Sequence, residues 1–422
     1  ASSFNSGSKK IVVCRDGRLS SPDLVKSLKK GLLESGADVI DIGLGPSPML
    51  YYAANHLESD GAIMVTGSHN PSNHNGFKIM KGTVPFFGDD ISDIGVRGLN
   101  SDWSYSSGSS KEYYIEDEYI KTLLKSTKIN NLKKNIKVVW DPGNGAAGDI
   151  IKKLVGYLPG EHILINENID GSFPAHHPDP TDPKNLEEMI SVVKDKKFDV
   201  GVAFDGDGDR LGLVSGKGNI IWGDQIVALL SQEVLKDKPY APIIADVKAS
   251  QTLFNEIKRL GGVPIMWKTG HSFIKAKMKE ISAPLAGEMS GHIFFSDRYY
   301  GYDDGIYAAL RVLELISDNY TLDDFLSSLP KTFSTQEIKI NCSDEEKFTI
   351  IEELSILLDK AGLTVNKIDG LRVQKDDGWW LLRASNTQAV LVARIEANSE
   401  DSLKSFQEEL SFYLKKFNLT LT

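Results

Sequence analysis

The sequence predicts three successive α/β units that place loops at one shared face, followed by a separate α+β domain. Two observations lead to this fold class. Short apolar segments of strand length alternate, three times along the chain, with segments whose apolar residues recur at helical spacing. The C-terminal part instead has several short strands flanked by helices. A chain of 422 residues is also too long for one ordinary core, which suggests about two to four domains.

The first unit opens with a short apolar strand over residues 11–14. Ser21-Pro22 favours the start of a helix, because proline fits the first helical position, and the next strand covers residues 39–42. A further strand, Gly61–Val65, leads directly into a loop that contains Ser68. Open α/β sheets bind ligands at the carboxyl ends of their strands, so this loop is a candidate site.

The second and third units repeat this order of strand and helix. Residues 143–145 form a tight turn between a strand and a helix, and a later strand of the second unit ends at a loop with three aspartates. The segments expected in the two units are strand 137–140, helix 149–155, strand 198–204, strand 243–246, helix 251–260 and strand 263–267.

The C-terminal domain has a different pattern. Its expected segments are strand 337–341, helix 346–361, short strands between residues 363 and 397, and helix 402–416. A weakly hydrophobic, serine-rich stretch at residues 101–111 and the region near Lys331 are plausible boundaries. We therefore expect domains over residues 1–112, 113–218, 219–331 and 332–422.

The composition excludes several classes of protein. Hydrophobic residues make up 41% and charged residues 25%, which is typical of a globular chain. The net charge of −10 argues against nucleic acid or an anionic membrane as the main partner. Cys14 and Cys342 are the only cysteines, so no disulfide framework is expected. No apolar run approaches the roughly 20 residues that span a bilayer, and no signal peptide is recognisable, so we expect a cytoplasmic protein.

Ser68 lies in the hexapeptide Thr66-Gly67-Ser68-His69-Asn70-Pro71, which glycine and proline favour as a turn. A serine hydroxyl becomes a nucleophile when a base or a metal activates it. His69 and Lys78 are close in sequence and could supply proton transfer or positive charge. The alternative is a turn in which the serine only bonds its own backbone.

The hexapeptide Asp205-Gly206-Asp207-Gly208-Asp209-Arg210 places three carboxylates at alternate positions. In an extended segment these side chains would face one way and could share a cation. Oxygen ligands favour Mg²⁺, Mn²⁺ or Ca²⁺, and three carboxylates leave positions open for a phosphate oxygen on Mg²⁺. Arg210 adds a donor suited to phosphate. The alternatives are a polar turn or a structural Ca²⁺ site, but the glutamate of an EF-hand is missing at Gly216.

Two further segments carry groups suited to ligand binding. Glu288 and Ser290 lie two residues apart, so on an extended segment both could bond neighbouring sugar hydroxyls; a polar strand edge is the alternative. The run Arg383-Ala384-Ser385-Asn386-Thr387 could bind a phosphate, or could be a β-turn. Weaker signals come from Lys248, His271 and Lys275.

Taken in order, these four motifs resemble those of the α-D-phosphohexomutase family, most closely its bacterial phosphomannomutase/phosphoglucomutase branch, and the resemblance covers nearly the whole chain. It implies three related α/β domains around a central cleft, with a C-terminal α+β domain of TATA-box-binding-protein-like fold. It also implies Mg²⁺ as cofactor, hexose phosphates as substrates, and a monomer or weak homodimer.

The resemblance also assigns roles by position. It implies that Ser68 is the phosphoserine and completes a metal site with Asp205, Asp207 and Asp209, while Lys78 is a general acid/base near His69. Matches to substrate-binding positions are Arg210, Lys248, His271, Glu288, Ser290, His292, Arg383, Ser385, Asn386 and Thr387. The implied reaction interconverts a hexose 1-phosphate and 6-phosphate. Phosphorylated Ser68 donates its phosphoryl group, a hexose 1,6-bisphosphate forms and reorients, and its other phosphate returns to Ser68.

The chain departs from the family pattern in two places. No Tyr-Asp-Ile-Arg-Gly-like motif precedes the strand at residues 11–14. Either the first domain lacks this opening strand and its active-site arginine, or the sequence is part of a longer protein; we expect the second, because a missing strand would leave an unpaired sheet edge. Gln388-Ala389 replaces the usual acidic residue and proline.

Three other functions are compatible with part of this pattern. Phosphoglucosamine mutases share most motifs but tend to have glutamine at the position of Met289. A non-catalytic sugar-phosphate-binding protein could use the same scaffold. A structural Ca²⁺ module would leave the Ser68, Glu288 and Arg383 segments unexplained.

Overall fold

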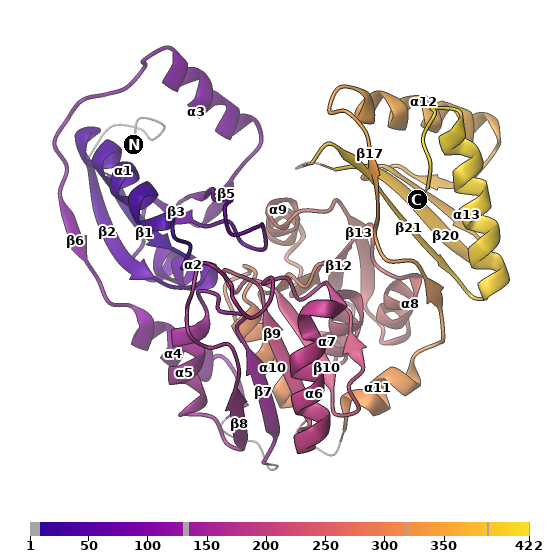
Figure 1. The fold of residues 1–422 in the computed structure, drawn as a ribbon, viewed down its shortest axis with the longest axis horizontal. Coiled ribbons are helices and arrows are strands. Elements are labelled where there is room, and N and C mark those ends of the chain that lie inside the picture. The colour runs from indigo at the N-terminus through magenta and orange to yellow at the C-terminus, as the bar shows by residue number, and fades with distance from the viewer. Residues whose placement is uncertain (1–8, 130–134, 317–319, 386–387, 422) are drawn as a thin grey trace.

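The computed structural model describes residues 9–129, 135–316, 320–385 and 388–421. Within these residues the chain forms four sheets, one in each predicted unit. Figure 1 shows the first and fourth sheets on opposite sides of the molecule, with the second and third between them. The predicted strands and helices agree with the observed bounds to within two residues, and the predicted fold class is confirmed.

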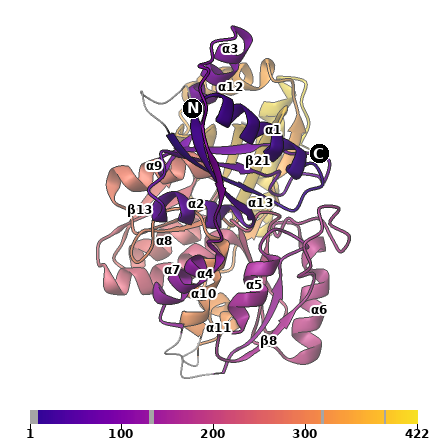
Figure 2. The same cartoon turned by 90° about the vertical axis from the view of Figure 1, so that its left-hand side faces the viewer.

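The first sheet has the strand order β5-β4-β3-β1-β2-β6. β1 pairs in parallel with β2 and β3, so the loops after β1 and β3 lie at the same edge. α3 buries none of its side chains and lies at the outer end of this unit (Figures 1 and 2). The bounds are β1 Lys9–Arg15, α1 Ser21–Glu34, β2 Ala37–Leu44, α2 Ser47–His56, β3 Gly61–Val65, β4 Phe77–Lys81, β5 Val84–Phe86, α3 Asp89–Leu99 and β6 Ser110–Glu112.

The second sheet has the order β11-β10-β9-β7-β8. β9 is buried throughout and pairs antiparallel with β10, so the aspartate loop connects the two strands. The bounds are α4 Glu116–Lys125, β7 Lys137–Asp141, α5 Gly148–Val155, β8 Glu161–Leu164, η2 Pro183–Leu186, α6 Glu187–Lys196, β9 Val200–Phe204, β10 Leu211–Ser215 and β11 Ile220–Ile221.

The third sheet has the order β13-β12-β14-β15, in which β12 pairs in parallel with β13 and β14. The bounds are α7 Gly223–Asp237, β12 Pro242–Asp246, α8 Gln251–Arg259, β13 Val263–Trp267, α9 His271–Ile281, β14 Leu285–Gly287, β15 Ile293–Phe295, α10 Gly305–Ile316 and α11 Leu322–Ser328. α9 lies near the centre of the molecule in Figure 1.

The fourth sheet has the order β16-β21-β20-β19-β18, with β17 also on β21, and its pairs are antiparallel. α12 packs on β20, and α13 packs on β20 and β21. The bounds are β16 Phe333–Ser334, β17 Ile338–Asn341, α12 Glu346–Lys360, β18 Val365–Asn366, β19 Leu371–Lys375, β20 Gly378–Ala384, β21 Val390–Ala397 and α13 Glu400–Lys415.

The hydrophobic core is divided between the first three units and the last. One large group of contacting buried side chains extends through the first three units and includes Val12, Trp140 and Leu229. The fourth unit has its own core, in which Leu354 and Leu410 are fully buried. A smaller group of buried side chains, Val247 of the third unit with Trp379 and Leu381 of the fourth, connects the fourth unit to the rest. Over the described part of the chain, no helix combines the length and apolarity needed to cross a membrane.

Candidate active site

Ser68 lies in the loop after β3 with a backbone φ of 48°, a conformation uncommon for residues other than glycine. Its N–H donates to Thr66 Oγ1 at 2.8 Å, as expected for a side chain that closes a turn. Its Oγ donates to Asp205 Oδ2 at 2.6 Å and lies 3.3 Å from His69 Nδ1. The hydroxyl therefore points out of the loop toward the aspartate segment.

Arg18 supports the Ser68 loop through hydrogen bonds to its backbone. The sequence analysis did not identify this residue. It is buried, and its guanidinium donates to the backbone carbonyls of Ser68, Asn70, Pro71 and His74 at 2.5–3.0 Å. Arg18 lies in the loop after β1, which ends at Arg15, at the same sheet edge as the loop after β3. That position at a strand end is the signal that could have identified it.

The aspartate segment is a turn, so the predicted extended conformation was wrong. Gly208 has a φ of +74°, and its N–H donates to the carbonyl of Asp205 at 3.0 Å, which folds the segment back. The turn nevertheless brings one carboxylate oxygen each of Asp205, Asp207 and Asp209 within 4.8 Å of one another. All three residues are fully buried. The three carboxylates therefore converge because the backbone turns, and not because alternate residues of a strand face the same side.

The aspartate turn and the Ser68 loop lie in direct contact. A Cβ atom added to Gly206 would lie 2.4 Å from the carbonyl oxygen of Ser68, closer than real Cβ contacts allow. Gly206 is therefore required so that the two backbones can approach one another.

Lys78 and Ser47 of the first unit both donate hydrogen bonds to the aspartate cluster, and Lys78 also brings a positive charge. Lys78 Nζ donates to Asp207 Oδ2 at 2.6 Å and to Asp209 Oδ2 at 2.5 Å, and Ser47 Oγ donates to Asp207. Burial would lower the pKa of Lys78, but Asp207 and Asp209 raise it well above its usual value. Lys78 is therefore a cation at neutral pH.

The pKa values of the three aspartates shift in different directions. Burial and the nearby Asp207 carboxylate raise the pKa values of Asp205 and Asp209. Burial would also raise the pKa of Asp207, but the Lys78 ammonium lowers it below the usual value. Three carboxylates packed this closely need additional positive charge to be ionised together.

Arg210 connects the aspartate turn to two histidines. Its Nε donates to His292 Nε2 at 3.0 Å, and its Nη2 lies 3.5 Å from His69 Nε2. The adjacent Arg210 charge, followed by burial, lowers the pKa of His69 to about 3. His69 is therefore uncharged at neutral pH.

Glu288 and Ser290 lie in a turn, so the prediction that they alternate on an extended segment was wrong. β14 ends at Gly287, and the N–H of Gly291, whose φ is +91°, donates to the carbonyl of Glu288 at 3.0 Å. Glu288 is buried, and its Oε1 accepts from the Gly270 N–H at 2.6 Å. Ser290 is half-buried.

Of the remaining predicted residues, His271 begins α9 and its ring stacks on that of His292, whereas Lys248, Arg383 and Ser385 lie near the contact of the third and fourth units. Lys248 Nζ donates to Glu337 Oε1 at 2.5 Å. Arg383 Nε donates to Asp369 Oδ2 at 3.0 Å, and the same oxygen accepts from the N–H of Thr269, two residues before His271. The buried Ser385 accepts a hydrogen bond from the N–H of Gln388. Asn386 and Thr387 lie outside the described residues.

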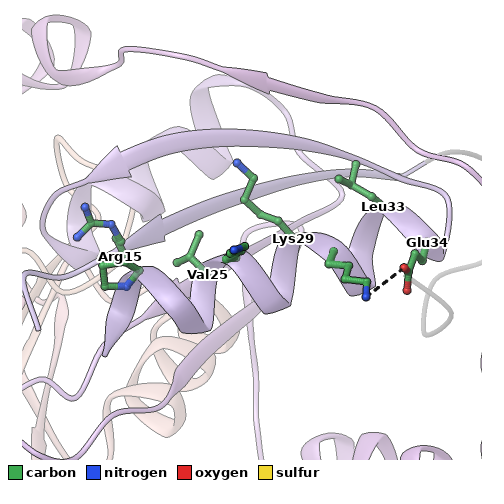
Figure 3. A pocket seen from close by; sticks show the side chains of 8 residues that line it. Arg15, Val25, Lys29, Leu33 and Glu34 are labelled. Carbon is green, nitrogen blue, oxygen red and sulfur yellow. Dashed lines mark ion pairs between the residues drawn. The ribbon is translucent and has the colours of Figure 1, made fainter. Parts of the chain in front are cut away.

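A surface hollow of about 600 Å³ lies elsewhere, on α1 of the first unit. Figure 3 shows Arg15, Val25, Lys29, Leu33 and Glu34 around it. None of the predicted site residues lines this hollow, so it is separate from the site at Ser68.

The assembled site joins a hydroxyl, a carboxylate cluster and several fixed cations from three units. Such a set can hold a divalent cation and phosphate groups, and can orient a hydroxyl for phosphoryl transfer. Comparison with known proteins agrees with this chemistry. Family models described as phosphoglucomutase/phosphomannomutase match four segments: alpha/beta/alpha domain I at residues 1–95, domain II at 117–218, domain III at 222–333, and the C-terminal domain at 337–411.

Curated relatives and a solved structure match over almost the whole chain. A phosphomannomutase/phosphoglucomutase of Pseudomonas putida is 45% identical over 97% of this chain and 88% of its own length. A phosphoglucomutase of Neisseria meningitidis is 41% identical over 97% and 89%. The crystal structure of a phosphoglucomutase/phosphomannomutase family protein from Burkholderia thailandensis superposes with a TM-score of 0.91, at 41% identity, over 97% of this chain and 90% of that one. With four domain matches in order and this degree of identity, the chain belongs to the phosphoglucomutase/phosphomannomutase family.

Proposed function

We propose that this chain is a phosphohexomutase that interconverts the 1-phosphate and 6-phosphate of mannose, glucose or both. The reaction would proceed through a phosphoserine at Ser68 and a hexose 1,6-bisphosphate intermediate. Relatives named phosphomannomutase/phosphoglucomutase, at 44–45% identity over 97% of this chain, support the reaction class. The observation that carries the proposal is the hydrogen bond from Ser68 Oγ to Asp205, within the aspartate cluster.

The aspartate cluster fits Mg²⁺, and we propose that Asp205, Asp207, Asp209 and the Ser68 phosphate hold it. Asp207 Oδ1 and Asp209 Oδ1 are buried and have no hydrogen-bond partner within the described residues, which supports a cation ligand role. The donor set is entirely oxygen, which suits a hard cation. When bound, Mg²⁺ would neutralise charge that develops on the phosphoryl group.

In the transfer step, Ser68 Oγ and the substrate hydroxyl exchange a phosphoryl group for a proton. The substrate hydroxyl oxygen attacks phosphorus, the bond between phosphorus and Ser68 Oγ breaks, and the hydroxyl proton ends on Ser68 Oγ. In the dephosphorylated form Asp205 accepts that proton as a hydrogen bond. His69 contacts the same oxygen, and the Lys78 ammonium, which is held by two aspartates, supplies positive charge or a proton.

We assign the other predicted residues to substrate binding. Arg210 and His292 lie beside the aspartate turn, and Glu288 with Ser290 would bond sugar hydroxyls. Lys248 and His271 from the third unit would line the substrate cleft, and the loop of Arg383, Ser385, Asn386 and Thr387 from the fourth would bind the distal phosphate. Lys248 and Arg383 are already paired with the carboxylates Glu337 and Asp369, which supports binding sites for anionic oxygens.

We further propose domain boundaries at residues 1–112, 113–218, 219–331 and 332–422, a cytoplasmic location, and a monomer or weak homodimer. Phosphoglucosamine mutase activity is the second candidate, and no specific observation favours it. The non-catalytic alternative is weakened by the direct contact between Ser68 and the aspartate cluster.

The test is the intact mass of the protein before and after incubation with glucose 1,6-bisphosphate and Mg²⁺, followed by peptide mapping. The wild type should gain one phosphoryl group on the peptide with Ser68, and Ser68→Ala should gain none. Ser27→Ala, on the exposed face of α1, is the matched control and should behave as the wild type. Phosphorylation of Ser68→Ala, or its full turnover of glucose 1-phosphate, would remove Ser68 from this role.

A further inference from the structure

Asp303 is a buried carboxylate next to His292, and it lies outside the four sequence motifs around Ser68, Asp205, Glu288 and Arg383. It is fully buried, just before α10, and its Oδ1 accepts a hydrogen bond from Lys275 Nζ at 2.8 Å. Its Oδ2 lies 3.0 Å from His292 Nδ1 and 3.5 Å from His271 Nδ1. Lys275, on α9, is itself only 7% exposed and lies 4.4 Å from the ring centre of Tyr51. A buried ion pair therefore lies against a histidine of the site.

The tautomers of His292 and His69 follow from Arg210, because a guanidinium can only donate hydrogen bonds. Arg210 Nε donates to His292 Nε2, so that nitrogen carries no proton, and the proton of neutral His292 is on Nδ1, facing Asp303. On the other side, Arg210 Nη2 faces His69 Nε2, which places the proton of His69 on Nδ1, facing Ser68 Oγ. These tautomers are assigned from the hydrogen-bond network.

The same assignment argues against a second metal ion. Ligand atoms of Asp209, His292 and Asp303 all lie within 4.8 Å of one another, which resembles a metal site. A metal there would need the lone pair of His292 Nδ1. Since Nε2 already accepts from Arg210, a neutral ring has its proton on Nδ1 and has no lone pair there. The cluster therefore binds a proton in that position.

We propose that Asp303, held by Lys275, is a positioning residue that fixes the direction of a hydrogen-bond chain from His292 through Arg210 and His69 to Ser68 Oγ. This inference rests on the proposed role of Ser68. The Asp303 carboxylate lies 3.0 Å from His292 Nδ1, and its negative charge favours a proton on that nitrogen, which is the same tautomer that Arg210 requires when it donates to Nε2. Arg210 in turn orients His69 so that its Nδ1 proton points to the oxygen that gains or loses the phosphoryl group.

The pKa shifts in this region indicate that Asp303, next to His292, is an ionised carboxylate. Burial would raise the pKa of Asp303, but Lys275 and the adjacent histidines lower it well below its usual value. Burial and Lys275 lower the pKa of His271 well below its usual value, so His271 adds no charge of its own. An ionised carboxylate is the stronger partner for an imidazole N–H.

The kinetic test uses two double variants that remove the buried ion pair without leaving one charge alone. Asp303→Leu/Lys275→Met removes the carboxylate oxygen 3.0 Å from His292 Nδ1 and leaves Asp209 Oδ1 at 3.5 Å from that nitrogen, whereas Asp303→Asn/Lys275→Met retains one oxygen at residue 303. We expect the first to lower kcat for glucose 1-phosphate by about 10- to 100-fold, in the range typical of residues that orient a functional histidine. KM should change less than kcat, and the asparagine variant should recover part of kcat.

Asp304→Asn is the matched control for stability. Asp304 is equally buried and accepts from the hydroxyls of Tyr119 and Tyr299, outside the chain of contacts to Ser68. We expect Asp304→Asn to lower Tm while kcat stays near that of the wild type. If Asp303→Leu/Lys275→Met has wild-type kcat, the proposed positioning role is wrong.

Nitrogen-15 NMR of the histidine rings tests the tautomers without any assay of turnover. Signals are assigned with His292→Asn and His69→Asn. The wild type should have both rings protonated on Nδ1 alone, and Asp303→Leu/Lys275→Met should move the His292 proton partly or wholly to Nε2. Protonation of wild-type His292 on Nε2 would overturn the inference even if Ser68 is phosphorylated. Correct tautomers without Ser68 phosphorylation would instead reject the proposed function.

Discussion

Ser68 Oγ and Asp205 Oδ2 are 2.6 Å apart although 137 residues separate them in the chain. The contact joins the loop after β3 of the first sheet to the turn after β9 of the second. Neither loop forms a site by itself, because the hydroxyl comes from one unit and the carboxylates from another. The geometry of the site therefore depends on how closely the two backbones approach.

Gly206→Ala tests that approach. The added Cβ would lie 2.4 Å from the Ser68 carbonyl oxygen, so one of the loops must move. We expect loss of most Ser68 phosphorylation and a decrease of about 1–3 kcal/mol in the free energy of unfolding, as for other overpacked sites. Gly31→Ala is the control, because its Cβ would meet no atom within 4 Å in a helix, and it should stabilise by up to about 1 kcal/mol. Denaturant titration with phosphoserine mass analysis measures both effects. Normal phosphorylation of Gly206→Ala would show that the loops tolerate the displacement.

Lys78→Met tests the charge balance of the aspartate cluster. The substitution removes the ammonium that Asp207 and Asp209 share, and leaves buried carboxylates without a cation. We expect a loss of about 3 kcal/mol of stability in the absence of metal. Because a ligand that binds only the folded state stabilises it, Mg²⁺ should raise the Tm of the variant more than that of the wild type.

Lys30→Met is the control for the lysine change. Its side chain is 75% exposed and forms one surface ion pair with Glu34, so stability should change by no more than about 0.5 kcal/mol. Thermal unfolding is measured for each protein with EDTA and with Mg²⁺. Equal Mg²⁺-induced shifts in Lys78→Met and the wild type would contradict the prediction that the Lys78 ammonium and the metal ion both compensate the charge of the aspartate cluster.

His176 gives a pH-dependent contribution to stability. Its Nε2 lies 3.0 Å from Asp141 Oδ2, and although burial lowers the pKa of His176, the Asp141 carboxylate raises it above the usual value of 6.5. The stabilisation is therefore complete below the unfolded-state pKa and is lost as the pH rises through the higher folded-state pKa. The difference in unfolding free energy between the wild type and His176→Gln should decrease from pH 6 to pH 8. A difference that is constant or increases over that range would show that the ring is not charged in the folded protein.

The sequence was sufficient to identify the loops that carry the chemistry, but not their conformation. Ser68 and the three aspartates follow buried strands, and strand ends gather at one edge of a sheet. The aspartates and the pair Glu288 and Ser290 were expected on extended segments. Positive φ values at Gly208 and Gly291 turn both segments back, and alternation of residue types cannot distinguish such a turn from a strand.

The residues that support the site were largely not predicted. Arg18 contacts the Ser68 carbonyl across 50 residues, and Ser47 contacts Asp207 across 160. Asp303 lies in no recognisable motif, and Lys275 had been only a weak candidate because most lysines are solvated. The contact of Ser47 with Asp207 depends on the packing of the first unit against the second, and those of Arg18 and Asp303 join segments that are distant in sequence within one unit. Local patterns of hydrophobicity and turn residues do not contain such contacts.

Arg18→Lys tests whether the Ser68 loop needs a preformed conformation. The guanidinium satisfies four backbone carbonyls of this loop, and an ammonium with three donors at one point cannot reproduce that fork. At least one buried carbonyl then lacks a partner, so we expect a loss of about 1–3 kcal/mol in unfolding free energy. Because Ser68 has a strained φ of 48°, a loosened loop should also lower the rate of Ser68 phosphorylation.

Arg259→Lys, whose ion pair with Glu256 is on the surface of α8, is the control for Arg18→Lys and should change neither stability nor the phosphorylation rate. Mass spectrometry of samples quenched at successive times gives the rate of Ser68 phosphorylation, and urea titration gives the unfolding free energy. A variant that loses stability but keeps the wild-type phosphorylation rate would show that Arg18 supports the fold alone.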